Sequence, residues 1–228
     1  MPQDSNIHGA IQPRYGEVHI RNRGRLPHWE KEEGLYFLTF RLADSLPRAI
    51  LQKISERHRI LDAARQNDAN LLPEQNTLLE EFSLKRIEDY IDRGAGSCAF
   101  RDQRVAGSMA AALRFHEGKR YRLLAWCIMP NHVHAVVRLF PGQEIAKVVR
   151  TWKSFSAKAA NHALDRKGSF WQREYYDHLI RNRDELSRAI HYILDNPSKA
   201  GLNNWIWVWS AGWEARTTAG QEASATNS

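Results

Sequence analysis

Cysteine is scarce in this chain, and long apolar runs are missing. Only two cysteines occur among 228 residues, Cys98 and Cys127, and they form no C-x-x-C pair. The sequence therefore predicts neither a disulfide framework nor a structural zinc knuckle. No run approaches the roughly 18 apolar residues of a membrane span, and the opening "MPQDSNIHGA" lacks the regions of a signal peptide. We expect a cytoplasmic location and no membrane partner.

Further absences narrow the class of protein. No glutamate stands at the H-E-x-x-H spacing, which disfavours a metal hydrolase that uses an activated water. No internal repeat and no second core are visible, and 43% hydrophobic residues suffice for one domain. The chain has 33 Lys and Arg but only 26 Asp and Glu, which gives a net charge of +7. This balance favours a polyanionic partner, with a basic but merely solvated surface as the alternative.

The first half of the chain predicts one strand followed by helices. Residues 35–43, "LYFLTFRLA", are apolar on both alternating faces, as in a central strand. Helices are expected to begin at Pro47 and Pro73, the second ending at the Gly94-Ala95-Gly96 stretch. A third helix is expected near residues 104–116.

The second half predicts a hairpin, a long helix, a strand and a short helix. The hairpin covers residues 121–139, and the strand lies in "SFWQREYYDHLI". The short helix should begin near Asp184 and stop before Pro197, because the residue before a proline avoids the helical region. The long helix is expected to bury Ile145, Val148, Val149, Trp152 and Phe155.

The element order corresponds to one α+β domain. It reads as the split β-α-β-β-α-β pattern with an appended C-terminal helix. We divide the chain into a basic arm at 1–34, a domain at 35–201 and a tail at 202–228. The tail is rich in tryptophan before it becomes polar and, we expect, disordered. Its tryptophans either stack on bases or cover the sheet, and the covering role is favoured because buried tryptophan is the commoner use.

Two histidines stand one residue apart in the apolar run "WCIMPNHVHAVVRL" at residues 126–139. Strand side chains alternate, so His132, His134 and Val136 should share one face, while Val133 and its alternating neighbours share the other. Ordinary hydrogen-bonded histidines are the plainer explanation. A metal site requires support from elsewhere in the sequence.

The appended helix supplies that support. Tyr192 and Asn196 are four residues apart and therefore lie on the same helix face. Two neutral imidazoles and an amide oxygen make three protein ligands, which leaves a divalent ion open positions for phosphate oxygens and water. A tyrosine hydroxyl is a poor nucleophile at neutral pH, and a metal on the scissile phosphate would compensate by withdrawing charge from phosphorus. The expected product is a phosphotyrosine ester.

These motifs resemble the single-tyrosine HUH transposases, and more closely their REP-associated branch. The likeness rests on "MPNHVHAVV" followed by "YILDNPSKAGL", with "LPHWE", "YFLTFRLADSLP" and "FWQREYYDHLIRN" in addition. It runs from about Leu26 to Gly201. Many relatives have Gln where this chain has Asn196, so the helix must approach the hairpin more closely here.

The resemblance implies a function and a set of roles. By position, His132 and His134 match metal-binding histidines, Tyr192 the nucleophile and Asn196 the third ligand. The family further implies a ferredoxin-like fold and Mg²⁺ or Mn²⁺ as the cofactor. It implies a substrate of single-stranded DNA that forms a REP-like hairpin. A monomer is favoured over a dimer. The uneven basic charge gives the predicted DNA contacts. These are Arg21, Arg23, Arg25, Lys147, Arg150, Lys153 and Lys158.

Two alternatives stay open at this point. One is a protein of the same fold that grips a DNA or RNA hairpin as a regulator, without chemistry. The other is a different nucleophile, Tyr175 or Tyr176, from the "YYDH" stretch. Neighbouring strand residues point to opposite faces and no ligand follows at helical distance, so we expect a structural or stacking role for both tyrosines.

Overall fold

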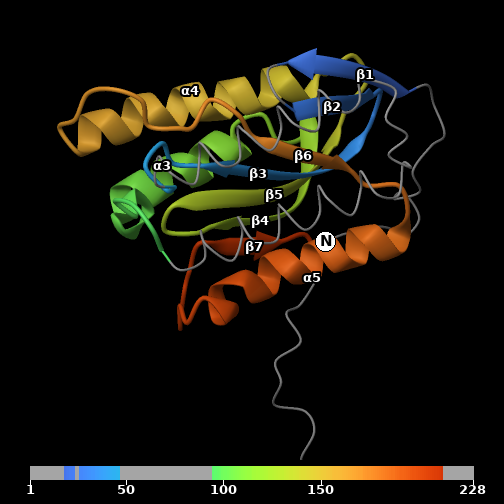
Figure 1. Cartoon of the computed structure of the whole chain (residues 1–228). Coiled ribbons are helices and arrows are strands. Elements are labelled where there is room, and N and C mark those ends of the chain that lie inside the picture. Colours follow the sequence, from blue (N-terminus) through green and yellow to red (C-terminus); the bar gives the residue numbers. More distant parts are fainter. Residues whose placement is uncertain (1–17, 24–25, 47–93, 213–228) are drawn as a thin grey trace, which may run out of the picture.

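The computed structural model describes residues 18–23, 26–46 and 94–212, with side chains from residue 31 onward. The helices predicted to begin at Pro47 and Pro73 lie outside these ranges, as does the tail beyond Gly212. The described part is built on a five-stranded antiparallel sheet of order β6-β3-β5-β4-β7 (Figure 1). The strands are β3 (Leu35–Arg41), β4 (Tyr121–Ile128), β5 (His132–Leu139), β6 (Tyr176–Leu179) and β7 (Val208–Ser210).

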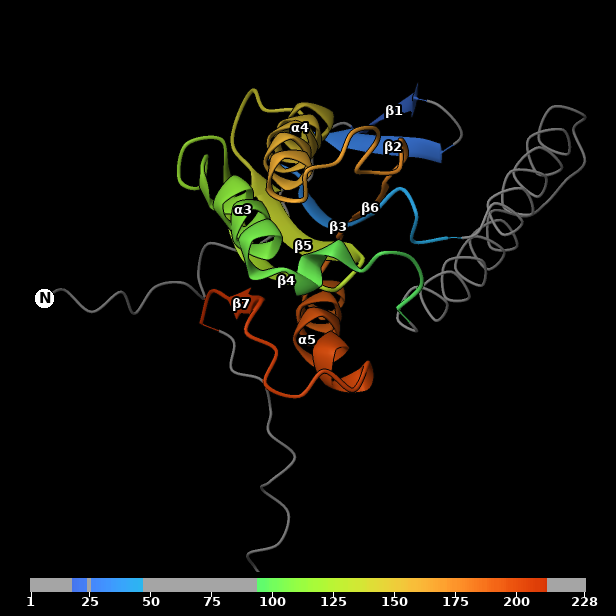
Figure 2. The ribbon, with the colours of Figure 1, turned by 90° about the vertical axis from the view of Figure 1, so that its left-hand side faces the viewer.

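Helices cover both faces of this sheet. Helices α3 (Gln103–Arg114) and α4 (Ile145–Ala163) lie on one face, and α5 (Arg183–Lys199) lies on the other (Figures 1 and 2). A short 3₁₀ turn, η1 (Ala99–Arg101), precedes α3. The order β3-α3-β4-β5-α4-β6 with α5 appended confirms the predicted α+β pattern. Strands β3 and β5 are the central strands of this pattern, as the two apolar faces of β3 predicted.

Alternate residues of the central strands serve two separate cores. Tyr36, Leu38 and Phe40 of β3 join the core under α3 and α4. Leu35 and Phe37, between them, join the core under α5. Strand β5 divides in the same way. This alternation gives each face of the sheet its own helix layer.

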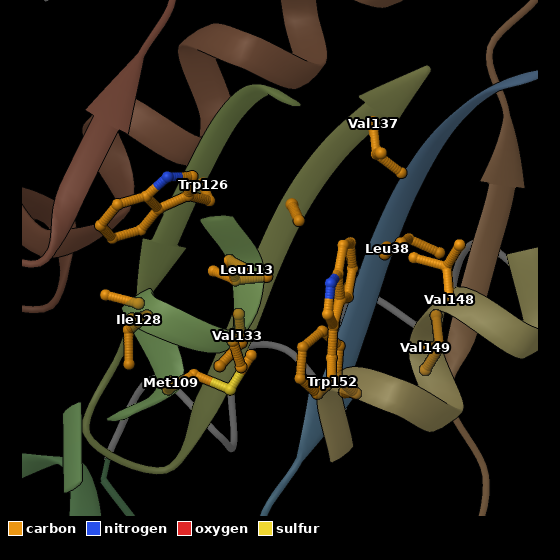
Figure 3. Packing of buried hydrophobic residues seen from close by; sticks show 14 of the residues in the cluster. Leu38, Met109, Leu113, Trp126, Ile128, Val133, Val137, Val148, Val149 and Trp152 are labelled. Atoms are coloured by element: carbon orange, nitrogen blue, oxygen red, sulfur yellow. The ribbon is translucent and has the colours of Figure 1, made fainter. Parts of the chain in front are cut away.

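The α3/α4 core is closed by aromatic side chains whose polar atoms are paired. Figure 3 shows Met109 and Leu113 of α3 and Trp152 of α4 over the sheet. Trp152 Nε1 donates to Tyr121 Oη at 2.7 Å, and Tyr121 Oη donates to the Leu113 carbonyl at 2.8 Å. Both groups are therefore buried without losing a hydrogen bond.

The predicted burial of Phe155 is wrong, since 53% of this residue is exposed. After Trp152 the buried stripe of α4 continues in steps of four, through Ser156 and Ala160. Phe155 precedes Ser156 by one residue and is turned about 100° around the helix from it. Its ring therefore faces outward.

Helix α5 is longer than its sequence predicted. It begins after the N-cap Asn182, whose Oδ1 accepts from Glu185 N at 2.8 Å, and it runs through Pro197 to Lys199. A proline lacks an N–H and its ring crowds the carbonyl four residues earlier, but the burial of Asn196 and Pro197 stabilises the last turn. The predicted stop before Pro197 is therefore wrong. Gly201, at φ +69°, lies just past the true end.

Two segments outside the central domain also form strands. Within the predicted arm, β1 (Val18–Arg23) and β2 (Leu26–Lys31) pair as an antiparallel hairpin. In the tail, β7 pairs with β4, so the tail covers an edge of the sheet. Trp205 Nε1 donates to the Ile128 carbonyl at 2.7 Å, while Trp207 and Trp209 pack against the α3/α4 core. The favoured covering role is confirmed for these three tryptophans.

Candidate functional site

His132 and His134 face each other on the α5 side of the sheet. Their Nε2 atoms are 2.9 Å apart, and 1% and 0% of the two residues are exposed. Val133, between them, belongs to the core on the opposite face. The predicted shared face of the two imidazoles is confirmed.

Each imidazole is held by its other nitrogen. His132 Nδ1 lies 2.8 Å from Asn131 Oδ1, and His134 Nδ1 lies 2.8 Å from Thr39 Oγ1 on the neighbouring strand. Anchoring one ring nitrogen fixes the direction of the other, which is the usual arrangement around histidines that bind metals. The two Nε2 atoms therefore converge on one point.

Burial keeps both rings neutral. It lowers the pKa of His134 to about 3, with a further contribution from the charge of Arg41. It also lowers the pKa of His132 well below its ordinary value, since a proton there would be repelled by Arg41 and by any proton that His134 gained. The neutral imidazole is the form that donates a lone pair to a metal ion.

Tyr192 of α5 packs directly on this pair. Its ring centroid is 5.2 Å from that of His134 with the planes at 80°, and 5.8 Å from that of Phe37. The hydroxyl oxygen is buried, and Lys199 Nζ lies 5.7 Å from the ring centroid. The structure thus brings Tyr192 to His134, although they are distant in sequence.

Asn196 lies one turn further along α5 and is 1% exposed. Neither its amide oxygen nor its amide nitrogen has a hydrogen-bond partner in the described part of the chain. A buried polar group left in this state costs about 1–3 kcal/mol, which a bound water or ion would relieve. Among the described residues no three His, Cys, Asp or Glu side chains form a metal-binding group. Amide oxygens and neutral imidazoles are both groups that divalent cations accept as ligands.

Sequence reasoning missed three neighbours of the histidines: Thr39, Arg41 and Asn131. Thr39 is paired across the strands with His134, and Arg41 with His132. Phe37, Thr39 and Arg41 alternate along β3 and therefore share the face toward α5. The alternation was visible in the sequence, but the register between β3 and β5 was not.

The rival tyrosines are divided between the two faces, as predicted. Tyr175 packs against the α3/α4 core and Tyr176 against the α5 core. Tyr176 is paired with Thr39 on β3, and its ring centroid is 6.5 Å from that of Phe37. It therefore shares the histidine face, but β3 separates its strand from that of His134. Tyr192 is the tyrosine whose ring meets that of His134 edge to face.

The predicted DNA contacts on α4 lie away from the histidines. Lys147, Arg150 and Lys158 are exposed on α4, which covers the opposite face of the sheet (Figure 1). Lys153 differs, because its Nζ donates to the carbonyls of Gln172 at 2.6 Å and Arg173 at 3.0 Å. Burial lowers its pKa to about 8. Arg21 and Arg23 stand in β1, and Arg25 lies outside the described residues.

Residues 102–196 match the family model for IS200-like transposases. This segment contains His132, His134, Tyr192 and Asn196, so the site lies within the matched domain. This segment is therefore similar to the IS200-like transposases, and the resemblance seen in its motifs is confirmed. No helix of the described ranges has the length and apolar character needed to cross a membrane.

The curated relatives narrow the likeness to one branch. The chain is 26% identical over 99 residues to the REP-associated tyrosine transposase of Escherichia coli K12, covering 43% of this chain and 58% of that protein. A Haemophilus influenzae protein assigned to the same group is 26% identical over 102 residues, covering 39% and 56%. The match thus spans little more than half the length of either relative.

A solved structure is similar to this chain over a longer stretch. It is a REP-associated tyrosine transposase bound to a REP hairpin, 17% identical, with a TM-score of 0.45 and 79% of each chain covered.

Proposed function

We propose that this protein nicks and rejoins single-stranded DNA at hairpin-forming repeats, in a metal-dependent reaction with Tyr192 as the nucleophile. One observation carries the proposal. The ring of Tyr192 lies 5.2 Å from that of His134, whose Nε2 converges with that of His132, inside the IS200-like segment. A nucleophile and a cation site on one sheet face are what phosphoryl transfer to tyrosine requires.

His132, His134 and Asn196 would hold the cation, Mg²⁺ or Mn²⁺. Two neutral imidazoles and a buried amide without a partner among the described residues support this ligand set. When bound, the cation supplies positive charge that polarises the scissile phosphate. The protein supplies the dry surroundings that make this charge effective, because both histidines are fully buried.

Tyr192 would supply the attacking atom. Its oxygen forms a bond to phosphorus, the bond from phosphorus to the 3′ oxygen breaks, and the departing oxygen takes a proton while the tyrosine loses one. The DNA is then cut into a piece with a free 3′-hydroxyl and a piece joined to Tyr192 through its 5′ phosphate. Attack by another 3′-hydroxyl reverses the step and rejoins a strand.

Arg41 would hold the phosphate. It is paired with His132 across the strands, and its charge is close enough to lower the pKa of both histidines. A guanidinium presents a rigid fork of donors that fits phosphate oxygens. Arg41 can therefore fix the phosphate in line with the tyrosine oxygen.

Hairpin DNA is proposed as the substrate because of the basic surface and the similarity to REP-associated transposases. Exposed Lys147, Arg150 and Lys158 offer phosphate contacts, and the E. coli relative is named for its association with REP sequences. A hairpin presents both a duplex stem and unpaired nucleotides. The likeness to this branch makes such repeats the substrate to test first.

The test uses hairpin oligonucleotides labelled at either end, incubated with the full chain and Mg²⁺ or Mn²⁺. On a denaturing gel we expect the label downstream of the cut to become protein-linked, and the upstream piece to be released. EDTA should abolish both products. Binding without any cleavage in either metal would favour the non-catalytic hairpin binder, and cleavage without an adduct would favour an activated-water hydrolase.

A further inference from the structure

Thr39 and Asn131 hold the inner nitrogens of the two histidines, and both are buried, at 5% and 1% exposure. We propose that they are positioning residues: Asn131 fixes one tautomer of His132, and the Thr39 hydroxyl reverses its hydrogen bond when a divalent cation binds. This inference rests on the proposed cation site. It concerns what sets the affinity of that site.

The orientation of the Asn131 amide decides the tautomer of His132. Asn131 Nδ2 donates to the Ala95 carbonyl at 2.9 Å, so Oδ1 faces His132 Nδ1. That oxygen only accepts, so Nδ1 carries the hydrogen and Nε2 keeps its lone pair. Gly96, at φ +88°, lets this loop pass close to Asp44, since an added Cβ there would lie 2.5 Å from the Asp44 carbonyl oxygen.

His134 must then donate to His132 when no cation is present. The two Nε2 atoms are 2.9 Å apart, and two lone pairs would repel each other at that distance. The hydrogen of His134 therefore sits on Nε2, and its Nδ1 accepts from the Thr39 hydroxyl. The hydrogen bonds run in one direction, from Thr39 to His134, His132, Asn131 and the Ala95 carbonyl.

A cation between the histidines needs both Nε2 lone pairs. His134 must then carry its hydrogen on Nδ1 instead, a change of tautomer that leaves its charge at zero. The buried Nδ1–H requires an acceptor, and the Thr39 hydroxyl becomes one by rotating about a single bond. A side chain of the same shape without the hydroxyl leaves that donor unpaired.

Thr39→Val and Thr39→Ser form a matched pair for this proposal. We expect Thr39→Val to weaken Mn²⁺ binding, measured by calorimetry, by about 10-fold to 100-fold, the usual effect of losing such a partner. Thr39→Ser keeps the hydroxyl and should bind nearly as tightly as the wild type. Equal affinity in Thr39→Val, or an equal loss in Thr39→Ser, would overturn the proposed role of the hydroxyl.

Nitrogen chemical shifts of the histidine rings give a second readout that does not depend on activity. Without metal, we expect hydrogen on Nδ1 of His132 and on Nε2 of His134; with Mg²⁺, both should carry it on Nδ1. A metal-free His134 with hydrogen on Nδ1 would refute the relay. A wild type with these metal-free tautomers but no Mn²⁺ affinity would refute the cation site while leaving the hydrogen-bond chain intact.

A separate observation concerns the outer face of α4. Phe155 is 53% exposed, and α4 contains no acidic residue. Lys147 lies eight residues before Phe155 and Lys158 three residues after it, so both lysines are on the same side of the helix. Arg150 is exposed beside them. We propose that this face binds unpaired nucleotides, with Phe155 stacking on a base and the cations contacting phosphates.

This surface is distinct from the candidate active site. Helix α4 lies on the opposite face of the sheet from α5 (Figure 2), whose Tyr192 packs on His134. A flat ring needs the face of an unpaired base, whereas a duplex offers only its phosphates. The α4 face should therefore contribute affinity for single strands and leave the chemical step unchanged.

Fluorescence anisotropy with one labelled oligonucleotide, single-stranded or annealed, tests this proposal. Phe155→Ala should weaken single-strand binding by about 10-fold, Phe155→Trp should keep it, and duplex binding should not change. Cleavage at saturating oligonucleotide should also be unchanged, which separates this surface from the proposed chemistry. Unchanged single-strand affinity, an equal loss on duplex, or a change of oligomeric state in Phe155→Ala would overturn it.

Discussion

Several polar residues are buried at this site, and their burial does not by itself stabilise the fold. His132 and His134 are paired through every ring nitrogen, whereas the Asn196 amide has no partner within the described residues. Natural sequences break the rule of satisfied burial mainly where function requires it. The unpartnered amide is therefore an observation in favour of the proposed cation site.

Tyr192→Phe is the most direct test at the residue scale. It removes only the attacking oxygen and keeps the ring against His134, so folding and hairpin binding should persist while the covalent adduct disappears. Tyr175→Phe and Tyr176→Phe are the controls, from the two faces of the sheet. An adduct that survives in Tyr192→Phe but is lost in Tyr176→Phe would move the nucleophile to β6.

Arg41→Gln tests the proposed phosphate contact. Loss of one charged donor at a reacting phosphate should lower the single-turnover cleavage rate by about 100-fold. Arg41→Lys keeps the charge and loses the fork, so we expect an intermediate rate. Equal rates in wild type and Arg41→Gln would remove Arg41 from the reaction.

At the scale of elements, α4 is tied to the segment before β6 by one lysine. Lys153 Nζ donates to two carbonyls, and burial lowers its pKa from 10.5 to about 8. The folded protein therefore gives up this proton more readily than the unfolded chain. Below pH 8 the buried charge lowers the free energy of unfolding by its full amount. This destabilisation decreases as the pH rises from 8 toward 10.5.

We expect Lys153 to make the free energy of unfolding rise with pH between 8 and 10.5, the window set by its two pKa values. Urea unfolding of wild type and Lys153→Met across this window measures the effect. Lys147→Met, at an exposed position of the same helix, is the control and should run parallel to the wild type. A Lys153→Met variant that parallels the wild type would contradict the shift.

The exposed cations of α4 predict a salt effect. Replacing Lys147, Arg150 and Lys158 together by Gln should weaken binding to all single strands. The dependence of log affinity on log salt should flatten by up to about 2, at roughly 0.7 per phosphate contact. Anisotropy titrations at several salt concentrations measure the slope. An unchanged slope would show that these side chains are only solvated and do not contact DNA phosphates.

At the scale of the whole molecule, the tail completes the sheet. Strand β7 covers the edge of β4, and Trp205 caps the Ile128 carbonyl. Without this segment β4 becomes an open edge, which invites association. The tail is thus part of the domain's structure, beyond the boundary at residue 201 that the sequence suggested.

Ending the chain at Leu202 should lower the thermal midpoint and increase self-association, because it removes β7 and exposes β4. Ending it at Gly212 keeps β7 and serves as the control. Calorimetry and light scattering on the two truncations measure both effects. Identical behaviour of the two proteins would show that β7 contributes nothing to the edge.

The sequence by itself determined the element order of the domain and the shared face of the two histidines. Both follow from local rules: strand side chains alternate, and helix residues four apart align. Local rules also failed where packing overrode them. Phe155 faces outward because the buried stripe shifts to Ser156, and α5 passes through Pro197 because that turn is buried.

Only the tertiary structure decided which distant residues meet. Strand register sets Thr39 beside His134 and Arg41 beside His132, and helix packing sets Tyr192 on the histidine ring. Register and packing depend on contacts between segments far apart in the chain, which periodicity within one segment does not encode. The same contacts placed the basic face of α4 on the opposite side of the sheet from Tyr192.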